Sequence, residues 1–370
     1  MKKSTILLIA ATILFFGCTK NDNKNTHNEP EPLTRIAFGS CCAQYLTNMK
    51  IFDRILELNP QLYIAGGDNI YGDFFALAPG TPEYIEGAYR QLAGRGYWSN
   101  FRSKIPEILP MWDDHDTGMN DGTSDNPVKG AAKQSFFKFW NIPADAPRRN
   151  RPDGGIYDSY YYGDDAHRVQ IILMDLRWNH TPYKTEGAAA ALAGYDTMMS
   201  PNATILGATQ WAWLEGELKK PAKVRVILST LQFNALYGGN ENWAILPLEK
   251  QKMYDLIKST GANGVFFVSG DVHFAELTKV QQPGLYPIYD LTSSGITHHE
   301  DKVAALNNSI RVGNGWQYVN FGFIDIDWKA TPVSIKLQIF GDTPGSGPNG
   351  KLVSADAKIS HTVTLDELKF

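Results

Sequence analysis

A carboxylate and a phenol stand three positions apart, directly after a short apolar stretch of the chain. The stretch is Leu62-Tyr63-Ile64-Ala65, and Gly67-Asp68-Asn69-Ile70-Tyr71 follows it. In open α/β sheets, ligands bind beyond the carboxyl ends of the strands, so polar side chains placed there can take part in chemistry. We therefore expect Asp68 and Tyr71 to belong to a functional site.

The same layout recurs at four further places. At each of them an apolar run ends in residues that can bind a metal or move a proton: Phe38-Gly39-Ser40-Cys41-Cys42, Asp113-Asp114-His115-Asp116, Gln232 with Asn234, and Asp271-Val272-His273. If the strands are parallel neighbours, these groups converge on one rim of a sheet. So many carboxylates would repel one another without cations, so the sequence predicts a metal site.

The elements that must position these residues can be read from the apolar pattern. Short, nearly continuous runs are typical of strands buried on both faces, and they occur at Arg35–Phe38, Leu62–Ala65, Ile108–Trp112, Val169–Met174, Val224–Leu228 and Val265–Val268. Helical spacing lies between them, which favours a largely parallel, layered α/β body. From about residue 285 the runs Leu285–Leu291, Tyr318–Asp325 and Pro332–Ile339 predict antiparallel return strands. No shift of composition divides residues 34–370, so we expect one domain with two sheets.

In content and order, these blocks resemble those of the PhoD-like (alkaline phosphatase D) family of the calcineurin-like metallophosphoesterases. The resemblance runs from about Arg35 to about Thr297. Phe38–Cys41 matches the block that carries a cysteine ligand, and Gly67–Tyr71 matches the block whose Asp bridges two metals. Asp114–Asp116 matches an Asn-His-Asp/Glu block with Asp in place of Asn, and Asp271–His273 matches the late metal-binding block with Asp where many relatives carry His.

The resemblance implies the family's α-β-β-α sandwich, in which helices flank two mixed sheets. It also implies an enzyme that hydrolyses phosphate esters through attack by a metal-bound hydroxide, without a covalent intermediate. The implied metal ligands are Cys41, Asp68, Tyr71, Asp114, Asp271 and His273. His115 is implied as the general acid, and Asp116 as the residue that orients it. A positioned imidazole typically contributes about 10²–10⁴-fold to the rate.

The types of ligand indicate which metals the site would take. A bridging carboxylate at Asp68 can hold two cations about 3.5–4 Å apart, which suits in-line displacement at phosphorus. Tyr71 as phenolate needs a strong Lewis acid, and Cys41 as thiolate prefers a transition metal, so both indicate Fe³⁺. Asp114 and Asp271 suit Ca²⁺ or another divalent ion such as Mn²⁺ or Zn²⁺. We therefore expect a heteronuclear site, as the family resemblance also implies.

Several residues keep two interpretations. Asp113 could replace Asp114 as ligand, Tyr71 could be a packed aromatic, and Cys41, like Cys42, could be a small core residue. Arg177 either contacts a substrate phosphate or forms an internal ion pair, and Gln232, also a candidate for substrate binding, stands where the wider superfamily often has a metal-binding His. Arg148, Arg149 and Arg151 either face an anionic substrate or lie in a solvated loop. His180, His298 and His299 match no block, and we expect them on the surface or in loops.

The N-terminus predicts export. Met1-Lys2-Lys3 followed by the apolar run Ile6–Phe16 is typical of a signal peptide, and Phe15-Phe16-Gly17-Cys18 resembles a bacterial lipoprotein cleavage box. We therefore expect a signal peptide at residues 1–17, lipidation of Cys18, a flexible tether over residues 18–33, and a location in the bacterial cell envelope. The formal net charge is −4, and loss of Lys2 and Lys3 would make it −6, so we expect no nucleic-acid partner except as a substrate.

Three functions remain in competition. A phosphoesterase acting on monoesters or diesters accounts for all the metal blocks. A non-catalytic surface lipoprotein could retain the same fold as a binding platform. A hydrolase with Cys41 as nucleophile would leave Asp68, Asp114 and Asp271 unexplained, so we rank it last.

Overall fold

The computed structural model describes residues 31–73, 78–184, 194–236, 241–300, 308–341 and 356–370. The chain divides into a segment Met1–Glu31 and a compact unit Pro32–Phe370, and the account below concerns the compact unit. The expected signal peptide, Cys18 and nearly all of the expected tether lie outside the described residues. Within the described ranges, no helix combines the length and the apolar character needed to cross a membrane.

Two six-stranded mixed sheets form the centre of the unit. The first has the order β12-β11-β10-β1-β2-β3. Its parallel half consists of β1 (Arg35–Gly39), β2 (Leu62–Gly66) and β3 (Ile108–Met111), and its antiparallel half of β10 (Asn320–Asp327), β11 (Ser334–Gly341) and β12 (Ile359–Thr364). The second has the order β4-β5-β6-β7-β9-β8. Its strands are β4 (Asp158–Tyr162), β5 (Val169–Leu173), β6 (Val224–Leu228), β7 (Val265–Ser269), β8 (Ala275–Val280) and β9 (Ile288–Ser293).

Strands β5, β6 and β7 show why the centre of the second sheet is parallel. Their sequences, VQIIL, VRVIL and VFFVS, are buried at every position, as expected for strands covered on both faces. They pair in parallel with one another, and β9 continues the parallel set beside β7. The carboxyl ends of these strands therefore share one edge of the sheet.

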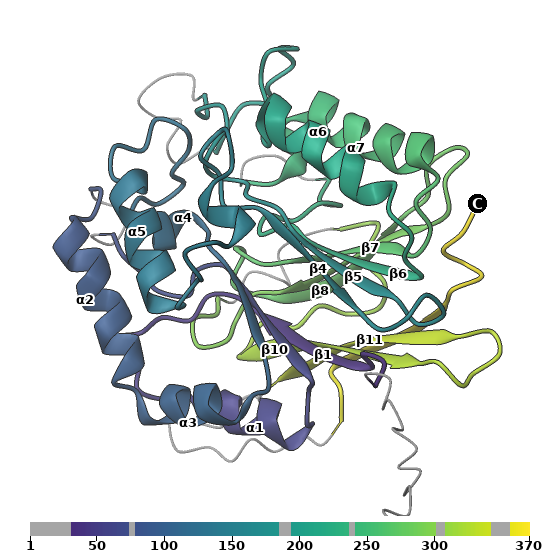
Figure 1. The fold of residues 1–370 in the computed structure, drawn as a ribbon, viewed down its shortest axis with the longest axis horizontal. Coiled ribbons are helices and arrows are strands. Elements are labelled where there is room, and N and C mark those ends of the chain that lie inside the picture. The colour runs from purple at the N-terminus through teal and green to yellow at the C-terminus, as the bar shows by residue number, and fades with distance from the viewer. Residues whose placement is uncertain (1–30, 74–77, 185–193, 237–240, 301–307, 342–355) are drawn as a thin grey trace, which may run out of the picture. The chain divides into compact units, whose positions relative to one another are not determined.

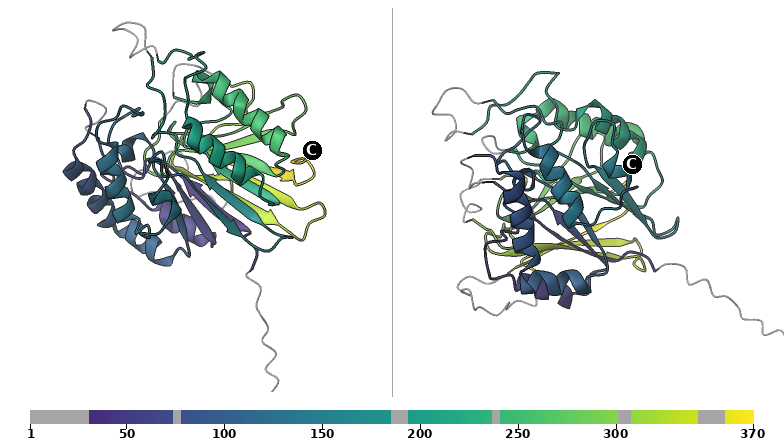
Figure 2. Two further views of the ribbon diagram at one scale, coloured as in Figure 1. Left: turned by 45° about the horizontal axis from the view of Figure 1, so that its top comes forward. Right: turned by 60° about the vertical axis from the view of Figure 1, so that its left-hand side comes forward.

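Helices cover the outer faces of the two sheets (Figures 1 and 2). On the side of the first sheet lie α1 (Ile51–Glu57), α2 (Pro82–Ala93), α3 (Gly96–Lys104), α4 (Asp114–Thr117) and α5 (Lys129–Phe139); on the side of the second lie α6 (Gly207–Leu218) and α7 (Pro247–Thr260). Local signals set the ends of these helices: Thr81 accepts a hydrogen bond from the Tyr84 amide at the start of α2, and Gly261 ends α7 with a φ of 63°. The predicted α-β-β-α sandwich is confirmed.

The two sheets meet at their carboxyl edges. Strands β9 and β10 are in contact, and Ser40 forms a parallel bridge to Ser294, just beyond the ends of β1 and β9. Loops that leave β1, β2 and β3 thus face loops that leave β7 and β9.

The apolar runs predicted as central strands are strands, and their bounds differ by one residue at most. One prediction was wrong in a way that matters for the site: the run Leu285–Leu291 does not form an antiparallel return strand beside β7. Its strand, β9, pairs in parallel with β7 and antiparallel only with the edge strand β8. The carboxyl end of β9 therefore reaches the same rim as the candidate site.

Candidate metal centre

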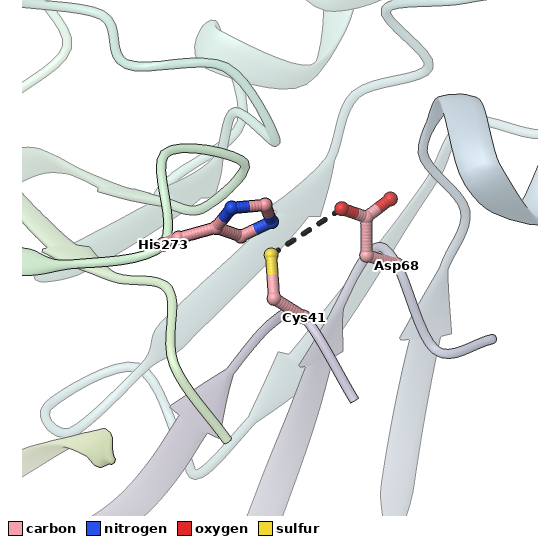
Figure 3. Close-up of side chains that lie close together, drawn as sticks. All are labelled: Cys41, Asp68 and His273. Carbon is pink, nitrogen blue, oxygen red and sulfur yellow. Dashed lines mark hydrogen bonds between the residues drawn. The ribbon is translucent and has the colours of Figure 1, made fainter. Parts of the chain in front are cut away.

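Thiol, carboxylate and imidazole groups come together between the two sheets. Cys41 follows β1, Asp68 follows β2 and His273 follows β7, and potential ligand atoms of the three lie within 4.8 Å of one another. Figure 3 shows these side chains pointing toward one another, with Cys41 Sγ 3.3 Å from Asp68 Oδ2. Parallel strands account for this convergence because their carboxyl ends share an edge.

The backbone of these loops is strained. Among the residues that the structure describes, seven other than glycine have a positive φ, and five of them surround the site: Cys41 (62°), Asp68 (48°), Asp121 (53°), Asp271 (71°) and His273 (63°). Each such residue costs on the order of 1–3 kcal/mol. Strain of this size, gathered at one place, indicates that the positions of these side chains serve a function.

The surroundings of Cys41 and His273 shift the pKa values of the two groups in opposite directions. Burial would raise the pKa of the Cys41 thiol, but the charge of His273 and hydrogen bonds from His273, Ser294 and Ser40 outweigh it and lower that pKa. Burial would likewise lower the pKa of His273, but Cys41 and Glu300 raise it to about 10. Cys41 is therefore poised as a thiolate, the form that binds metals.

Tyr71 is buried beside this pair. Its hydroxyl lies 3.1 Å from His273 Nε2 and 2.9 Å from His298 Nδ1. Burial, followed by the negative charges of Cys41 and Asp68, raises the pKa of Tyr71 well above its usual value. Without a strong Lewis acid the phenol therefore stays neutral.

A second group contains only oxygen donors. Asp113, Asp114 and Asp271 place carboxylate oxygens within 4.8 Å of one another, and Asp68 lies within the same distance of Asp114 and His115. Burial raises the pKa of Asp68 well above its usual value, and the charges of Cys41, Asp114 and Asp113 add to the effect. Burial would raise the pKa of Asp114 as well, but His115 and Arg177 lower it to about 2.

Arg177 is the internal counter-ion of the second group. Its guanidinium is buried and donates to Asp113, while Nη1 and Nη2 donate to the two carboxylate oxygens of Glu241 at 2.6 and 2.9 Å. Nη2 also lies 3.4 Å from Asp114 Oδ1 and 3.7 Å from Asp271 Oδ1. The internal ion pair is therefore the interpretation that holds, and a direct contact with substrate, for which Arg177 was also a candidate, does not fit its burial.

The donors that remain fit cations. Within the described part of the chain, Asp68 Oδ1 is buried and takes part in no hydrogen bond, and Asp114 Oδ1 is likewise without a hydrogen bond and has Arg177 Nη2 at 3.4 Å as its ion-pair partner. Buried carboxylates without partners are costly unless a cation neutralises them. The residues available to hold cations are Cys41, Asp68, Tyr71 and His273 on one side, and Asp68, Asp114 and Asp271 on the other.

His115 is held by a residue that the sequence did not indicate. Its Nδ1 lies 3.0 Å from Asp73 Oδ2, and its Nε2 lies 4.0 Å from Asp114 Oδ2. Asp116, expected to orient His115, instead accepts hydrogen bonds from the Asn69 and Asp113 amides and from the Tyr89 hydroxyl. Asp116 thus fixes the loop that carries His115, and Asp73 fixes the imidazole.

Comparison with known proteins shows the family of the chain. The sequence profile described as PhoD-like phosphatase matches residues 36–307. The chain belongs to the PhoD-like phosphatase family. The match extends from β1 past the loop that follows β9, and therefore includes every candidate ligand.

Individual relatives of this PhoD-like chain are distant. Alkaline phosphatase D of Bacillus subtilis (strain 168) is 22% identical over 241 residues, which cover 60% of this chain and 40% of that protein. The chain thus matches less than half the length of the curated relative. A solved structure of PhoD superposes with a TM-score of 0.69 at 17% identity, covering 91% of this chain and 71% of the other. A dimetal phosphatase from Danio rerio gives a TM-score of 0.49 at 9% identity, covering 90% and 100%. The likeness to PhoD shows a shared fold.

Other predicted site residues of this PhoD-like chain lie away from the centre. Gln232 is buried and donates to Glu276 Oε1 at 3.0 Å and to Thr292 Oγ1 at 2.9 Å, which does not fit substrate binding. Arg148, Arg149 and Arg151 all donate to backbone carbonyl oxygens, those of Arg148 belonging to Ile156 and to Pro110 in β3, so these guanidinium groups are engaged within the fold.

The histidines that match no family block differ from one another. His299 is exposed, as expected, but His180 is fully buried, with Nδ1 2.7 Å from the Thr181 carbonyl oxygen. His298 lies in a loop, as expected, and its Nδ1 is 2.9 Å from the Tyr71 hydroxyl, a contact that the sequence did not indicate. The sequence reasoning also missed Asp73, Glu241, Ser294 and Glu300. A parallel assignment of β9 would have brought Ser294, His298 and Glu300 to the rim.

Proposed function

We propose that the chain is a metal-dependent phosphoesterase that uses two or more cations. One observation carries the proposal: the buried carboxylate of Asp68 belongs to two donor groups at once, one with Cys41 and His273 and the other with Asp114 and His115. A residue in that position can join two cations, the arrangement used for in-line displacement at phosphorus. Membership of the PhoD-like phosphatase family supports it.

The donor types support different cations on the two sides. A thiolate, an imidazole and a phenol suit Fe³⁺ or another transition metal, whereas the carboxylates of Asp114 and Asp271 suit Ca²⁺ or Mn²⁺. His273 strengthens this assignment because its Nδ1 faces a carboxylate, Glu300 Oε1, at 3.0 Å. Histidines that bind metals almost always use their second nitrogen in this way. When bound, the cations would neutralise the phosphate and activate a water molecule.

His115 supplies the proton for the leaving group in this proposal. Asp73 holds Nδ1, so Nε2 is the atom directed toward the centre. Burial would lower the pKa of His115, but Asp114 and Asp73 outweigh it and raise the pKa to about 9. The imidazole thus carries a proton that it can give to the departing ester oxygen.

The test combines metal analysis with a simple assay. Purified protein should contain bound metal and should release nitrophenol from 4-nitrophenyl phosphate or from bis(4-nitrophenyl) phosphate, and the relative rates decide between monoesterase and diesterase. Asp68→Ala should lose metal and activity, whereas Asp165→Asn, which changes a highly exposed carboxylate, should keep both. Full metal and full activity in Asp68→Ala would refute the proposal. Metal binding without phosphate release would favour the non-catalytic binding lipoprotein.

We further propose that the protein is an exported lipoprotein of the bacterial cell envelope, anchored through Cys18. The charged head, the apolar run Ile6–Phe16 and the Gly17-Cys18 pair support this. Incorporation of labelled fatty acid into the wild-type protein, and its loss in Cys18→Ser, is the expected result. An unlabelled wild-type protein would contradict it.

A further inference from the structure

One short segment contacts every sulfur, nitrogen and phenol donor of the centre. This segment, the supporting loop, consists of Ser294–Glu300 and begins directly after β9. Its side chains reach Cys41, His273 and Tyr71, each from a different residue.

Ser294 is placed to donate a hydrogen bond to the Cys41 sulfur. Its hydroxyl oxygen accepts the backbone N–H of His273 at 2.8 Å and lies 3.0 Å from Cys41 Sγ. Because the oxygen already accepts from His273, the hydroxyl hydrogen is available to the sulfur. Ser294 is fully buried, so water does not compete for this bond.

The same loop holds Cys41 by its backbone. The amides of Thr297 and His298 donate to the Cys41 carbonyl oxygen at 3.2 and 3.1 Å. They hold Cys41 in a backbone conformation, with a φ of 62°, that a side-chain-bearing residue rarely adopts. The loop thus fixes the direction of the sulfur as well as its hydrogen bonding.

Glu300 fixes His273. Its carboxylate lies 3.0 Å from His273 Nδ1, and its amide donates to the His273 carbonyl oxygen at 2.9 Å. With Nδ1 held in this way, Nε2 faces the Tyr71 hydroxyl at 3.1 Å. A carboxylate at this position also makes the imidazole a stronger donor to a metal.

His298 fixes Tyr71. Its Nδ1 lies 2.9 Å from the Tyr71 hydroxyl, and its ring stacks on that of His273 with centroids 4.0 Å apart. His298 therefore contacts both the phenol and the imidazole of this half of the centre.

We propose that the supporting loop tunes the sulfur, nitrogen and phenol donors and thereby gives their half of the centre its preference for a transition metal. Ser294, His298 and Glu300 act as positioning residues through Cys41, Tyr71 and His273. The proposal rests on the metal centre of the proposed function. It is specific to one half of that centre, because Arg177 rather than the loop contacts the carboxylates of the other half.

Metal titration of the whole protein tests this. Glu300→Ala and His298→Ala should weaken the binding of Co²⁺ by about 10–100-fold, the usual effect of losing a partner of a ligand, and should change Ca²⁺ affinity by less than about twofold. Glu300→Gln and His298→Asn, which keep an acceptor and a donor in place, should restore most of the affinity. His299→Ala alters the exposed neighbour of both residues and should bind Co²⁺ like the wild type.

Absorption spectra give a second readout. Loss of a hydrogen bond raises the energy of the donor electrons, so Ser294→Ala should move the thiolate-to-Co²⁺ band to longer wavelength. His298→Ala should do the same for the phenolate-to-Fe³⁺ band. Circular dichroism and thermal melting of the metal-free variants show whether each variant is folded.

The outcomes separate the two proposals. Folded variants with wild-type Co²⁺ affinity and unchanged bands would overturn the role of the loop, as would a wild-type protein that takes up no Co²⁺. Shifted bands together with no hydrolysis of 4-nitrophenyl phosphate would overturn the phosphoesterase and leave the role of the loop standing.

Discussion

The two halves of the centre are stabilised by different means. In the oxygen half, Arg177 lies among Asp113, Asp114, Asp271 and Glu241 and provides a fixed positive charge. In the sulfur and nitrogen half, no lysine or arginine of the described ranges forms an ion pair with Asp68. Contacts with Ser294, His298 and Glu300, the last through a carboxylate that accepts from His273 Nδ1, position the donors there.

This difference shows how one centre can present two kinds of site a few ångströms apart. His115 and the guanidinium of Arg177 lower the pKa of Asp114 to about 2, whereas burial raises the pKa values of Asp113, Asp271 and Glu241 despite the nearby positive charge of Arg177. By contrast, hydrogen bonds to a thiolate and an imidazole change how strongly those groups donate electrons to a metal. In the proposed function, the first device suits a hard divalent ion and the second suits a transition metal.

Removing one ligand from each half is the most direct test of whether the two halves bind different metals independently. Cys41→Ser should lose the transition metal and keep most of the divalent ion, and Asp271→Asn should show the reverse. Each should lower hydrolysis by at least about 10³-fold, since a Lewis acid supplies several kcal/mol at the transition state. Elemental analysis and an aryl phosphate assay measure both effects. Equal loss of both metals in each variant would show that the halves do not bind independently.

His115 lies close to ligands of both halves. Its substitution tests whether it acts as the general acid. His115→Gln should lower hydrolysis of an alkyl phosphate by about 10²–10⁴-fold and that of 4-nitrophenyl phosphate much less, because nitrophenolate leaves without a proton. Asp73→Asn should follow the same pattern more weakly, since it only orients the imidazole. Equal losses on both substrates would argue against general acid catalysis. Asp116→Asn is the control, and it should lower stability without this dependence on the leaving group.

Removal of Arg177, the internal counter-ion of the oxygen half, should lower the stability of the protein. Arg177→Gln leaves Asp113 and Glu241 buried without a charged partner, which should lower the free energy of unfolding by about 3–5 kcal/mol. Arg90→Gln, which breaks a surface pair with Glu86, should cost less than about 1 kcal/mol. Urea unfolding of metal-free protein measures both variants. A small effect for Arg177→Gln would mean that the carboxylates are protonated rather than paired.

The smallest expected effect concerns His180, close to Arg177. Burial, with the charge of Arg177, lowers its pKa to about 3, so the folded state holds it neutral. The stability from this neutral form is complete above pH 6.5 and is lost as the pH falls, by about 2 kcal/mol between pH 6.5 and 5. His180→Asn should therefore lose that much less stability than the wild type over this range. Parallel stability curves for the two proteins would contradict this.

Most of the scaffold could be predicted from the sequence, because continuous apolar runs such as Val224–Leu228 carry their own evidence of burial on both faces. The ligand blocks could be predicted for a related reason. Cys41, Asp68, Asp114 and Asp271 each come shortly after a strand, so their position in the sequence places them on the rim of the sheets. Edge strands such as β4 (DSYYY) lack that signal, since they alternate polar and apolar side chains only weakly.

The partners of the ligands could not be predicted in the same way. Whether β9 runs parallel or antiparallel to β7 depends on long-range strand pairing, which the sequence of β9 itself does not indicate. The direction of β9 decides where Ser294, His298 and Glu300 lie. Asp73 and Asp116 are both acidic residues near His115, and Asp73 meets the imidazole because the loop after β2 folds back on α4, where the Gly72 amide donates to the His115 carbonyl oxygen at 3.0 Å. Likewise, Arg177 and Glu241 find each other across 64 positions of the chain.

The separation of the donors along the chain also bears on when the centre can form. Cys41 and Asp271 are 230 positions apart, and the bond from the Ser40 hydroxyl to Ser293 spans 253. Closing such long loops costs conformational entropy, so we expect these contacts to form late in folding. A chain synthesised as far as β6 already has Cys41, Asp68 and Asp114, but it lacks His273 and the whole supporting loop. In the proposed function, uptake of a transition metal would therefore require a chain that has folded through β9 and the supporting loop.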